Sequence, residues 1–356
     1  MWQARVMAKR CMRSRTAAGE HSFAALRFFG LIRGCCMRTM RADSWRGRAR
    51  SMLRSIACGA GAVAALLAVI PARAESPPQR LPSAVLQYPL IVVEGGGLTR
   101  DTRVELVNLT NRDLEAQCFY VQSGFCSETD FFVRLTANQP QSWLASRGAS
   151  NSLTGSAVPP FSGTGELKCV VLPSRPEVDA HNAIQGRAIV FGADGQTISY
   201  GATGFRRLTD GDYTSLIELD GETYTQCPGE LHFAFIAADD DPSSAPESEM
   251  VLVPCSEDLE NLRPATTSVL FQIVNEFEET LSASLTFTCY DRRPLRRISN
   301  VFTAAFLGSP TGHVTVRGVQ EPLLGLIVDQ FVDGALSTSA NEPFLRDGRS
   351  AVLRFP

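Results

Sequence analysis

The chain has 356 residues, of which 44% are hydrophobic and 20% charged, and its formal net charge is −3. That total conceals two opposite regions, because residues 1–74 carry 13 Arg and one Lys against two acids, whereas residues 75–356 carry 19 Arg and one Lys against 35 acids. Phosphate backbones repel so acidic a chain, which excludes nucleic acid as an expected partner of residues 75–356.

An apolar run of 15 residues, IACGAGAVAALLAVI, occupies positions 56–70. Arg50 and Arg54 precede it, and the small-x-small sequence Ala72-Arg73-Ala74 follows it. A basic segment, a short apolar core and a small-residue site form the pattern of a secretory signal peptide, here 52–74. The run is shorter than the roughly 20 residues that a membrane-spanning helix needs. We therefore expect cleavage after Ala74 and no membrane span in the mature chain.

Residues 1–51 are rich in Arg and have no clear apolar period. Two interpretations stay open: an unstructured basic extension, or a mis-assigned start with translation beginning at Met52. The second gives a signal peptide of ordinary length. A third alternative is a retained membrane anchor, which the basic Arg73 directly after the apolar run keeps open.

Six cysteines follow the predicted cleavage site, and an even number in an exported chain indicates disulfides. They are Cys118, Cys126, Cys169, Cys227, Cys255 and Cys289. Cys227 and Cys255 bracket one segment and are expected to pair, while Cys169 could pair with either Cys118 or Cys126. No Cys-x-x-Cys sequence occurs, so a structural zinc site or a thioredoxin-like redox pair is not expected.

Short apolar and β-branched runs alternate with Gly, Asn, Asp, Ser and Pro clusters from residue 90 to the end of the chain, which predicts strands. The expected strands are 90–93, 102–108, 114–121, 131–135, 167–172, 188–191, 197–200, 213–219, 231–236, 251–253, 269–275, 281–290, 314–317, 323–329 and 351–355. No helix of ten or more residues is expected. This pattern favours an all-β fold of sandwich or barrel type.

A faint internal repeat connects two of these regions. The sequence VELVN at 104–108 resembles FQIVN at 271–275, and six residues after each Asn a Leu-x-Ala begins, at Leu114 and at Leu281. Each then continues as an alternating strand. The repeat predicts two equivalent hairpins, although chance similarity between β-rich strands is the alternative.

The segment 102–121, TRVELVNLTNRDLEAQCFYV, resembles the opening hairpin of immunoglobulin-like β-sandwich modules in exported bacterial proteins. The likeness consists of x-V-x-L-x-N, a polar loop and L-x-A-x-C-F-Y-V, with a fainter echo at 269–290. It implies a fold class and no activity. The expected architecture is two successive immunoglobulin-like β-sandwich domains, 75–207 and 265–356, joined by connecting strands and an acidic loop at 208–264.

Acidic turns are the first chemical candidates. Asp210 and Asp212 precede the predicted strand 213–219, and Asp220 and Glu222 follow it. Calcium prefers six to eight carboxylate and carbonyl oxygens on flexible loops, so these four residues are the candidate metal ligands, and calcium is the one possible cofactor. The alternative is that they form solvated hairpin turns, since Asp-Gly is a strong turn signal.

A local basic cluster is the second candidate. Arg292, Arg293, Arg296 and Arg297 lie close together in an otherwise acidic region. They could bind an anionic group by charge-assisted hydrogen bonds, or pair with acids of the same chain. No histidine spacing suits a metal, and no Gly-x-Ser-x-Gly sequence marks a nucleophile. No catalytic residue is therefore predicted.

These observations predict an exported, non-catalytic protein with a binding or surface-structural role in the periplasm or outside the cell. Its expected partner is an envelope or extracellular protein or a glycan. The alternative is a secreted hydrolase that draws its carboxylates from the acidic turns and acts on a polysaccharide, which would need two carboxylates about 5–9 Å apart in a cleft.

Overall fold

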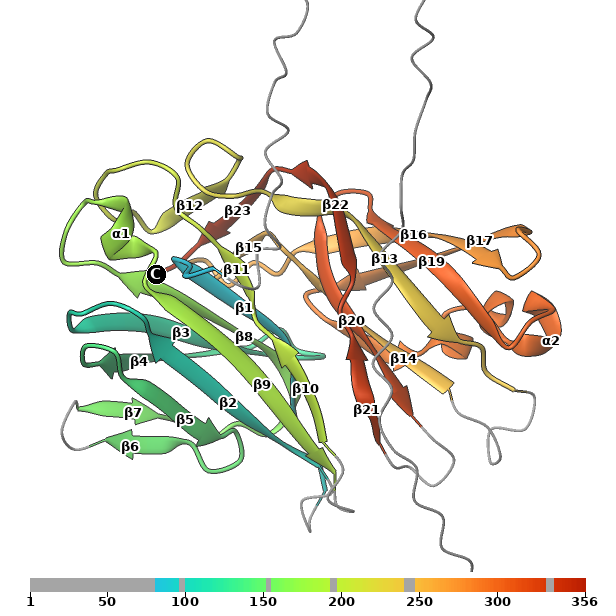
Figure 1. Cartoon of the computed structure of the whole chain (residues 1–356), viewed down its shortest axis with the longest axis horizontal. Coiled ribbons are helices and arrows are strands. Elements are labelled where there is room, and N and C mark those ends of the chain that lie inside the picture. Colours follow the sequence, from blue (N-terminus) through green and yellow to red (C-terminus); the bar gives the residue numbers. More distant parts are fainter. Residues whose placement is uncertain (1–80, 96–99, 152–154, 193–196, 240–246, 331–335) are drawn as a thin grey trace, which may run out of the picture. The chain divides into compact units, whose positions relative to one another are not determined.

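The computed structural model describes residues 81–95, 100–151, 155–192, 197–239, 247–330 and 336–356 (Figure 1). All of them belong to one compact unit, residues 72–356. The predicted extension and signal peptide, 1–51 and 52–74, lie outside the described residues, as does most of the acidic loop that follows Asp239.

The N-terminal part of the described chain, residues 81–205, forms two antiparallel sheets and a short hairpin. Sheet I contains, in spatial order, β11 (Thr203–Phe205), β1 (Val85–Val93), β8 (Gly163–Leu172), β3 (Leu114–Gln122) and β4 (Glu128–Leu135). Sheet II contains β10 (Thr197–Gly201), β9 (Ile184–Gly192), β2 (Arg100–Asn108) and β5 (Pro140–Leu144). The hairpin consists of β6 (Ala149–Asn151) and β7 (Ser156–Val158).

The C-terminal part, residues 216–356, forms three sheets. Sheet III contains β17 (Thr280–Thr288), β16 (Thr266–Asn275), β19 (Thr311–Gly318), β13 (Cys227–Ile236) and β22 (Phe344–Arg349). Sheet IV contains β18 (Asp291–Pro294), β14 (Glu247–Pro254), β20 (Leu323–Gln330) and β21 (Leu336–Asn341). Sheet V contains β12 (Leu216–Leu219), β23 (Ala351–Arg354) and β15 (Glu257–Asp258).

The helices of the described residues are single turns. They are α1 (Val178–His181), η2 (Leu295–Arg297), η3 (Asn300–Phe302) and α2 (Ala304–Leu307). The expectation of an all-β chain is therefore confirmed, and each expected strand overlaps an observed one. No helix in the described ranges has the length and apolar character that crossing a membrane would require.

The predicted pair of immunoglobulin-like β-sandwich domains is wrong. The five sheets have a five-bladed, propeller-like organisation within one compact unit. Their strand order departs from the consecutive meander of a regular propeller blade, because β1 pairs with β8 and β11, and β2 pairs with β5 and β9. Period-two alternation identifies strands and their faces, but it does not specify which distant strands pair. The predicted β-sandwich fold is wrong for this reason.

The two segments of the internal repeat are not equivalent. In the first, β2 belongs to sheet II and β3 to sheet I, so these consecutive strands do not pair. In the second, β16 and β17 form a hairpin in which Thr266 opposes Thr288 and Val274 opposes Thr280. The predicted equivalence of 102–121 and 269–290 therefore fails, and the similarity reflects the shared pattern of β-rich segments.

The two central strands of sheet IV, β14 and β20, are buried on both faces. Along β14, Val251 and Val253 pack into the core of the N-terminal part, whereas Met250 and Leu252 pack into a second core. Its neighbour β20 alternates in the same way, with Leu324, Leu326 and Val328 in the first core and Leu323 and Ile327 in the second. Strands buried on both faces are continuously apolar, which explains the run MVLV in β14 and LLGLIV in β20.

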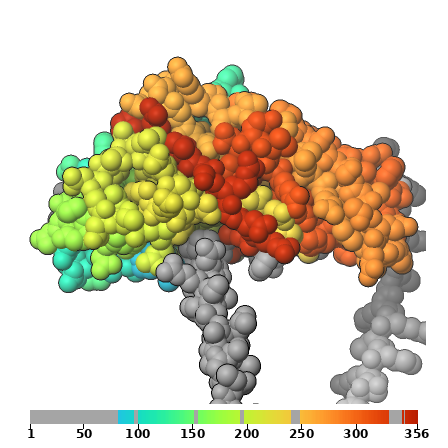
Figure 2. All heavy atoms as spheres, turned by 90° about the horizontal axis from the view of Figure 1, so that it is seen from above, coloured from blue at the N-terminus to red at the C-terminus, as the bar shows by residue number. Residues whose placement is uncertain are grey.

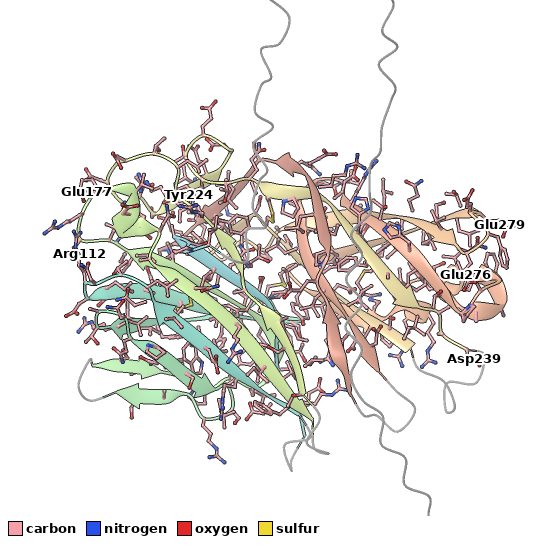
Figure 3. All side chains as sticks on the ribbon, in the orientation of Figure 1. Arg112, Glu177, Tyr224, Asp239, Glu276 and Glu279 are labelled. Atoms are coloured by element: carbon pink, nitrogen blue, oxygen red, sulfur yellow. A yellow bond between two sulfur atoms is a disulfide. The ribbon has the colours of Figure 1, made fainter. Side chains whose placement is uncertain are left out.

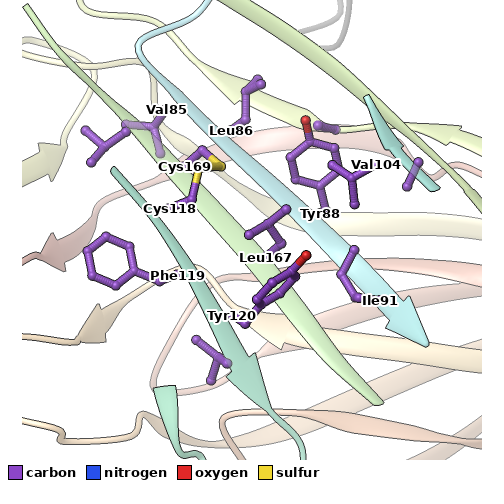
Figure 4. Packing of buried hydrophobic residues seen from close by; sticks show 14 of the residues in the cluster. Val85, Leu86, Tyr88, Ile91, Val104, Cys118, Phe119, Tyr120, Leu167 and Cys169 are labelled. Atoms are coloured by element: carbon purple, nitrogen blue, oxygen red, sulfur yellow. A yellow bond between two sulfur atoms is a disulfide. The ribbon is translucent and has the colours of Figure 1, made fainter. Parts of the chain in front are cut away.

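The first core fills the space between sheets I and II, extends over the other face of sheet I, and holds most of the large buried aromatic side chains (Figure 4). Tyr88 donates to the carbonyl of Glu105 on the facing sheet, and Trp143 Nε1 donates to the Tyr120 hydroxyl at 2.7 Å. Both of these buried tyrosine hydroxyls thus have a partner, which offsets their loss of water.

The C-terminal residues bridge both parts. Strand β23 pairs with β12 and β15, and the Phe355 ring lies 5.1 Å from the Phe119 ring of sheet I. In Figure 2 the C-terminal strands, drawn in red, run between the yellow-green residues of the β12–β13 region and the orange residues of β16 to β19. The last strand therefore joins the core of the N-terminal part.

Truncation of the second core should depend on burial within it. Phe271 is 1% exposed and meets Phe302 edge-on, so Phe271→Ala should lower the free energy of unfolding by about 3–5 kcal/mol. Leu285 is only half-buried on β17, so Leu285→Ala should cost clearly less. Urea unfolding of both variants measures this, and equal losses would contradict the assignment of Phe271 to the centre of the core.

Candidate functional site

A polar cavity of about 380 Å³ lies where strands of sheets I and IV approach each other. Its lining consists of three carboxylates, one guanidinium and three hydroxyls: Glu94, Glu249, Asp291, Arg292, Ser123, Thr164 and Tyr290. The volume falls within the range of small-molecule sites, about 300–1,000 Å³. We call it the junction cavity.

Arg292 is the central charge of the junction cavity. Its guanidinium lies 2.6 Å from Glu94 Oε1 and 3.1 Å from Glu249 Oε2, and it also donates to Thr164 Oγ1 at 3.3 Å. Burial opposes this positive charge, but the neighbouring carboxylates, Glu249 first, outweigh burial and raise the pKa of Arg292. Arg292 therefore stays charged and connects β18 to the N-terminal part.

Local strand pairing and a disulfide fix the position of Arg292. On β18 it lies opposite Val251 of β14, in a short edge strand that begins directly after the turn at Cys289. Cys289 is bonded to Cys126 in the turn that follows β3, with their Cα atoms 6.0 Å apart. The disulfide thus anchors the turn before β18 against sheet I.

Tyr290 supplies an unused hydroxyl group among the residues that line the junction cavity, where Arg292 Nε also has no hydrogen-bond partner among the described residues. The residue is 7% exposed, and its hydroxyl has no hydrogen-bond partner among the described residues. Burial raises the pKa of Tyr290 far above its ordinary value, so the hydroxyl stays protonated and can donate. A buried hydroxyl without a partner costs stability, which makes it a candidate contact for a ligand.

Asp291 is neutralised within the chain. Arg293 Nε lies 2.8 and 2.9 Å from its two carboxylate oxygens, a bidentate pair. Burial raises the pKa of Asp291, and the hydrogen bonds from Arg293 limit that rise. Each carboxylate of the junction cavity therefore has an arginine partner.

A second buried charge cluster lies on the same face of sheet I. Lys168, the only lysine after residue 74, is fully buried on β8. Its ammonium lies 2.5 Å from Glu166 Oε1 and donates to Glu257 on β15. This ion pair connects sheet I to sheet V, so it also spans the N- and C-terminal parts.

The carboxylates around Lys168 outnumber its single positive charge. Burial raises the pKa of Glu166 to about 8, and burial together with the nearby Glu257 raises the pKa of Glu128 to about 7. Like charges in a dry site cannot all ionise, so the cluster holds an extra proton at neutral pH.

All six cysteines are paired within the described residues. The expected Cys227–Cys255 bond is confirmed, and of the two alternatives for Cys169 the structure has Cys118. Cys118 and Cys169 face each other directly on the neighbouring strands β3 and β8. The third pair, Cys126–Cys289, spans 163 residues, and no local pattern pointed to it. Three disulfides place the folded chain in an oxidising, extracytoplasmic environment.

In the acidic turns, the aspartate side chains Asp210 and Asp220 accept hydrogen bonds from backbone amides. Asp210 Oδ1 accepts from the amide of Val178, and Asp220 Oδ1 accepts from the amides of Glu222 and Thr223. These backbone bonds outweigh burial and lower the pKa of Asp220. Of the four calcium candidates Asp210, Asp212, Asp220 and Glu222, none lines the junction cavity. Within the described ranges no three His, Cys, Asp or Glu side chains are grouped to hold a metal ion.

The predicted basic cluster is divided by the structure. Arg292 and Arg293 make the internal pairs described above, in agreement with the alternative that these arginines neutralise acids of the same chain. Arg296 and Arg297 belong to the next element, η2, and Arg297 is exposed. The four arginines therefore do not converge on one anion.

Two histidines that are distant in sequence meet on sheet III. The rings of His232 and His313 stack with centroids 5.6 Å apart, and His232 Nε2 lies 3.2 Å from Glu230. Burial and the neighbouring His232 lower the pKa of His313. Strand pairing of β13 with β19 creates this contact, which no spacing in the sequence could have revealed.

No family model matches the chain, and no curated protein matches it. The chemistry of the junction cavity and the disulfides therefore carry any assignment of function.

The proton held near Lys168 predicts how stability depends on pH. Because folding raises the pKa of Glu166 from 4.5 to about 8, its contribution to the free energy of unfolding is full below pH 4.5 and is lost as the pH rises toward 8. Glu166→Gln keeps a neutral side chain, so unfolding measured from pH 4.5 to 8 should show a shallower decline than in the parent chain. Glu128, His181 and His313 titrate in both proteins and cancel in the comparison. Identical pH profiles would contradict this assignment.

Proposed function

We propose that this is an exported, non-catalytic protein that binds a glycan of the cell envelope or its surroundings through the junction cavity. The observation that carries the proposal is that Tyr290, a residue of the cavity lining, has a buried hydroxyl without a partner among the described residues. The disulfides support a location in the periplasm or outside the cell, after removal of residues 52–74. N-terminal sequencing of the mature chain should begin at Glu75.

The lining of the cavity suits a hydroxyl-rich ligand. Tyr290 can donate a hydrogen bond, and the hydroxyls of Ser123 and Thr164 can both donate and accept. Sugars present alternating donors and acceptors of this kind. An anionic ligand fits less well, because the carboxylates outnumber Arg292 in the lining.

The pairing of the carboxylates favours binding over catalysis. Glycoside hydrolysis needs one carboxylic acid and one free carboxylate on either side of the scissile bond. In the junction cavity, Glu94 and Glu249 share Arg292, and Asp291 is held by Arg293. Strong internal pairing holds these side chains in place, which suits a preformed binding surface.

The decisive variant is Tyr290→Phe, which removes the hydroxyl and keeps the ring. We expect weaker binding on an array of envelope and extracellular glycans, by roughly 5- to 10-fold for one lost hydrogen bond of about 1–1.5 kcal/mol. Thermal stability should be unchanged or higher, because a buried hydroxyl without a partner is removed.

Tyr213→Phe is the matched control. Tyr213 also has a buried hydroxyl without a partner in the described residues, and burial raises its pKa to about 12, but it does not line the junction cavity. It should leave glycan binding unchanged. If both variants bind like the parent chain, or if the parent chain binds no glycan, the proposal fails.

A secreted hydrolase remains the second candidate, and one observation favours it. Three carboxylates line a single cavity, although they come from Glu94, Glu249 and Asp291 instead of the acidic turns. The test is release of reducing ends from a panel of polysaccharides. Activity that is lost in Glu249→Gln but kept in Glu222→Gln would support hydrolysis and overturn the non-catalytic proposal.

A further inference from the structure

Strand β17 forms an open edge of sheet III. In the strand order of this sheet it lies outermost, and among the described strands it pairs only with β16. It spans nine residues, Thr280–Thr288, and its outer backbone amides and carbonyls face no other described strand. An unpaired edge of this length is a template for a further strand.

The length and composition of β17 together distinguish it from the other sheet edges. Proteins usually protect edges with charges, proline or short strands. The edge strands β4 and β22 carry charged residues, β5 contains Pro140, and β18 combines charges with Pro294. In contrast, β17 reads TLSASLTFT, nine residues with neither a charge nor a proline. The edge strands β10, β21 and β11 also lack both, but β10 and β21 lie against each other and β11 has only three residues. Nothing in its sequence prevents pairing with another strand.

The first seven residues of β17 are a palindrome. Residues 280–286 read TLSASLT, the same in both directions, with Ala283 at the centre. In an antiparallel pair related by a twofold axis, each residue opposes its counterpart across the axis. Centring the axis on Ala283 makes every pair identical in kind: Thr with Thr, Leu with Leu, Ser with Ser and Ala with Ala.

We propose that two copies of this chain pair through β17, antiparallel and centred on Ala283, so that sheet III continues across a twofold axis. Ser282 of one copy then opposes Ser284 of the other on the exposed face. Leu281 opposes Leu285 on the face toward the second core, where both side chains are half-buried in the single chain. The dimer would cover these apolar side chains further.

On the side of β17 that pairs with β16, hydroxyl side chains already oppose each other across the two strands. On the exposed face of the β16–β17 hairpin, Thr266 and Thr288 hydroxyls are 2.8 Å apart, and those of Ser268 and Thr286 are 3.0 Å apart. Cross-strand hydroxyl pairs of this kind stabilise antiparallel sheets. The proposed pairing repeats the pattern on the open side.

Charge does not oppose this register. Glu276 and Glu279 lie at the hairpin end of β17, beyond or at the start of the paired region (Figure 3). With the axis at Ala283, Glu279 of one copy opposes Phe287 of the other. The acidic hairpin ends of the two copies therefore lie at opposite ends of the paired strands and do not repel each other at close range.

The test is the mass of the disulfide-bonded mature chain in solution, measured by sedimentation equilibrium over a concentration series. The parent chain should form a dimer. Ser282→Glu with Ser284→Glu places like charges opposite each other twice and should give a folded monomer whose melting temperature does not depend on protein concentration. The matched control adds two charges on the same exposed face but away from the edge, by Leu270→Glu with Gln272→Glu on β16, and should remain dimeric.

Charge complementation tests the register. Ser282→Lys with Ser284→Lys should also be monomeric alone, and mixing it with the double Glu variant should restore a heterodimer. A monomeric parent chain at every concentration would overturn the proposal, as would a dimer that the edge charges do not weaken. Since neither outcome involves the junction cavity, the result is independent of glycan binding.

Discussion

Sheet IV is the element on which the structure depends, because apolar side chains cover it on both faces. Val251 and Val253 of β14 complete the first core, and Met250 and Leu252 on the opposite face complete the second. Neither core is closed without this sheet, so burial on one face favours burial on the other. The hydrophobic effect thus joins the two parts of the chain into one unit.

Charged side chains buried between the N- and C-terminal parts lower the stability of the fold unless they are paired, and Arg292 and Lys168 are both paired. Arg292 connects Glu249 of β14 to Glu94 of the N-terminal part, and Lys168 connects Glu166 to Glu257. Breaking a buried pair is expensive, although its net contribution to stability is small. Such groups select one arrangement of the two parts, whereas the Tyr290 hydroxyl is one of the buried polar groups that have no hydrogen-bond partner in the described residues.

The sequence predicts the strands well and their arrangement poorly. Alternation identified β2, β3 and β16, and the local bracket identified Cys227–Cys255, because both signals act over short distances. Which sheet a strand joins depends on contacts between distant residues, so β2 and β3 were wrongly taken as a hairpin. The junction cavity was missed for the same reason, since Glu94, Thr164 and Arg292 are brought together from three separate regions. For the buried charge cluster on β8, the sequence offered one sign, because Lys168 is the only lysine after residue 74.

Native-state hydrogen exchange tests most directly whether the doubly buried sheet makes both cores one cooperative unit. Leu106 is fully buried on β2, in the first core and remote from sheet III, so Leu106→Ala should lower stability by about 2–5 kcal/mol. If the account is correct, the slowest amides of β16 and β19 lose the same opening free energy as those of β3 and β8. Unchanged protection in β16 and β19 would show that the second core unfolds independently and would contradict it.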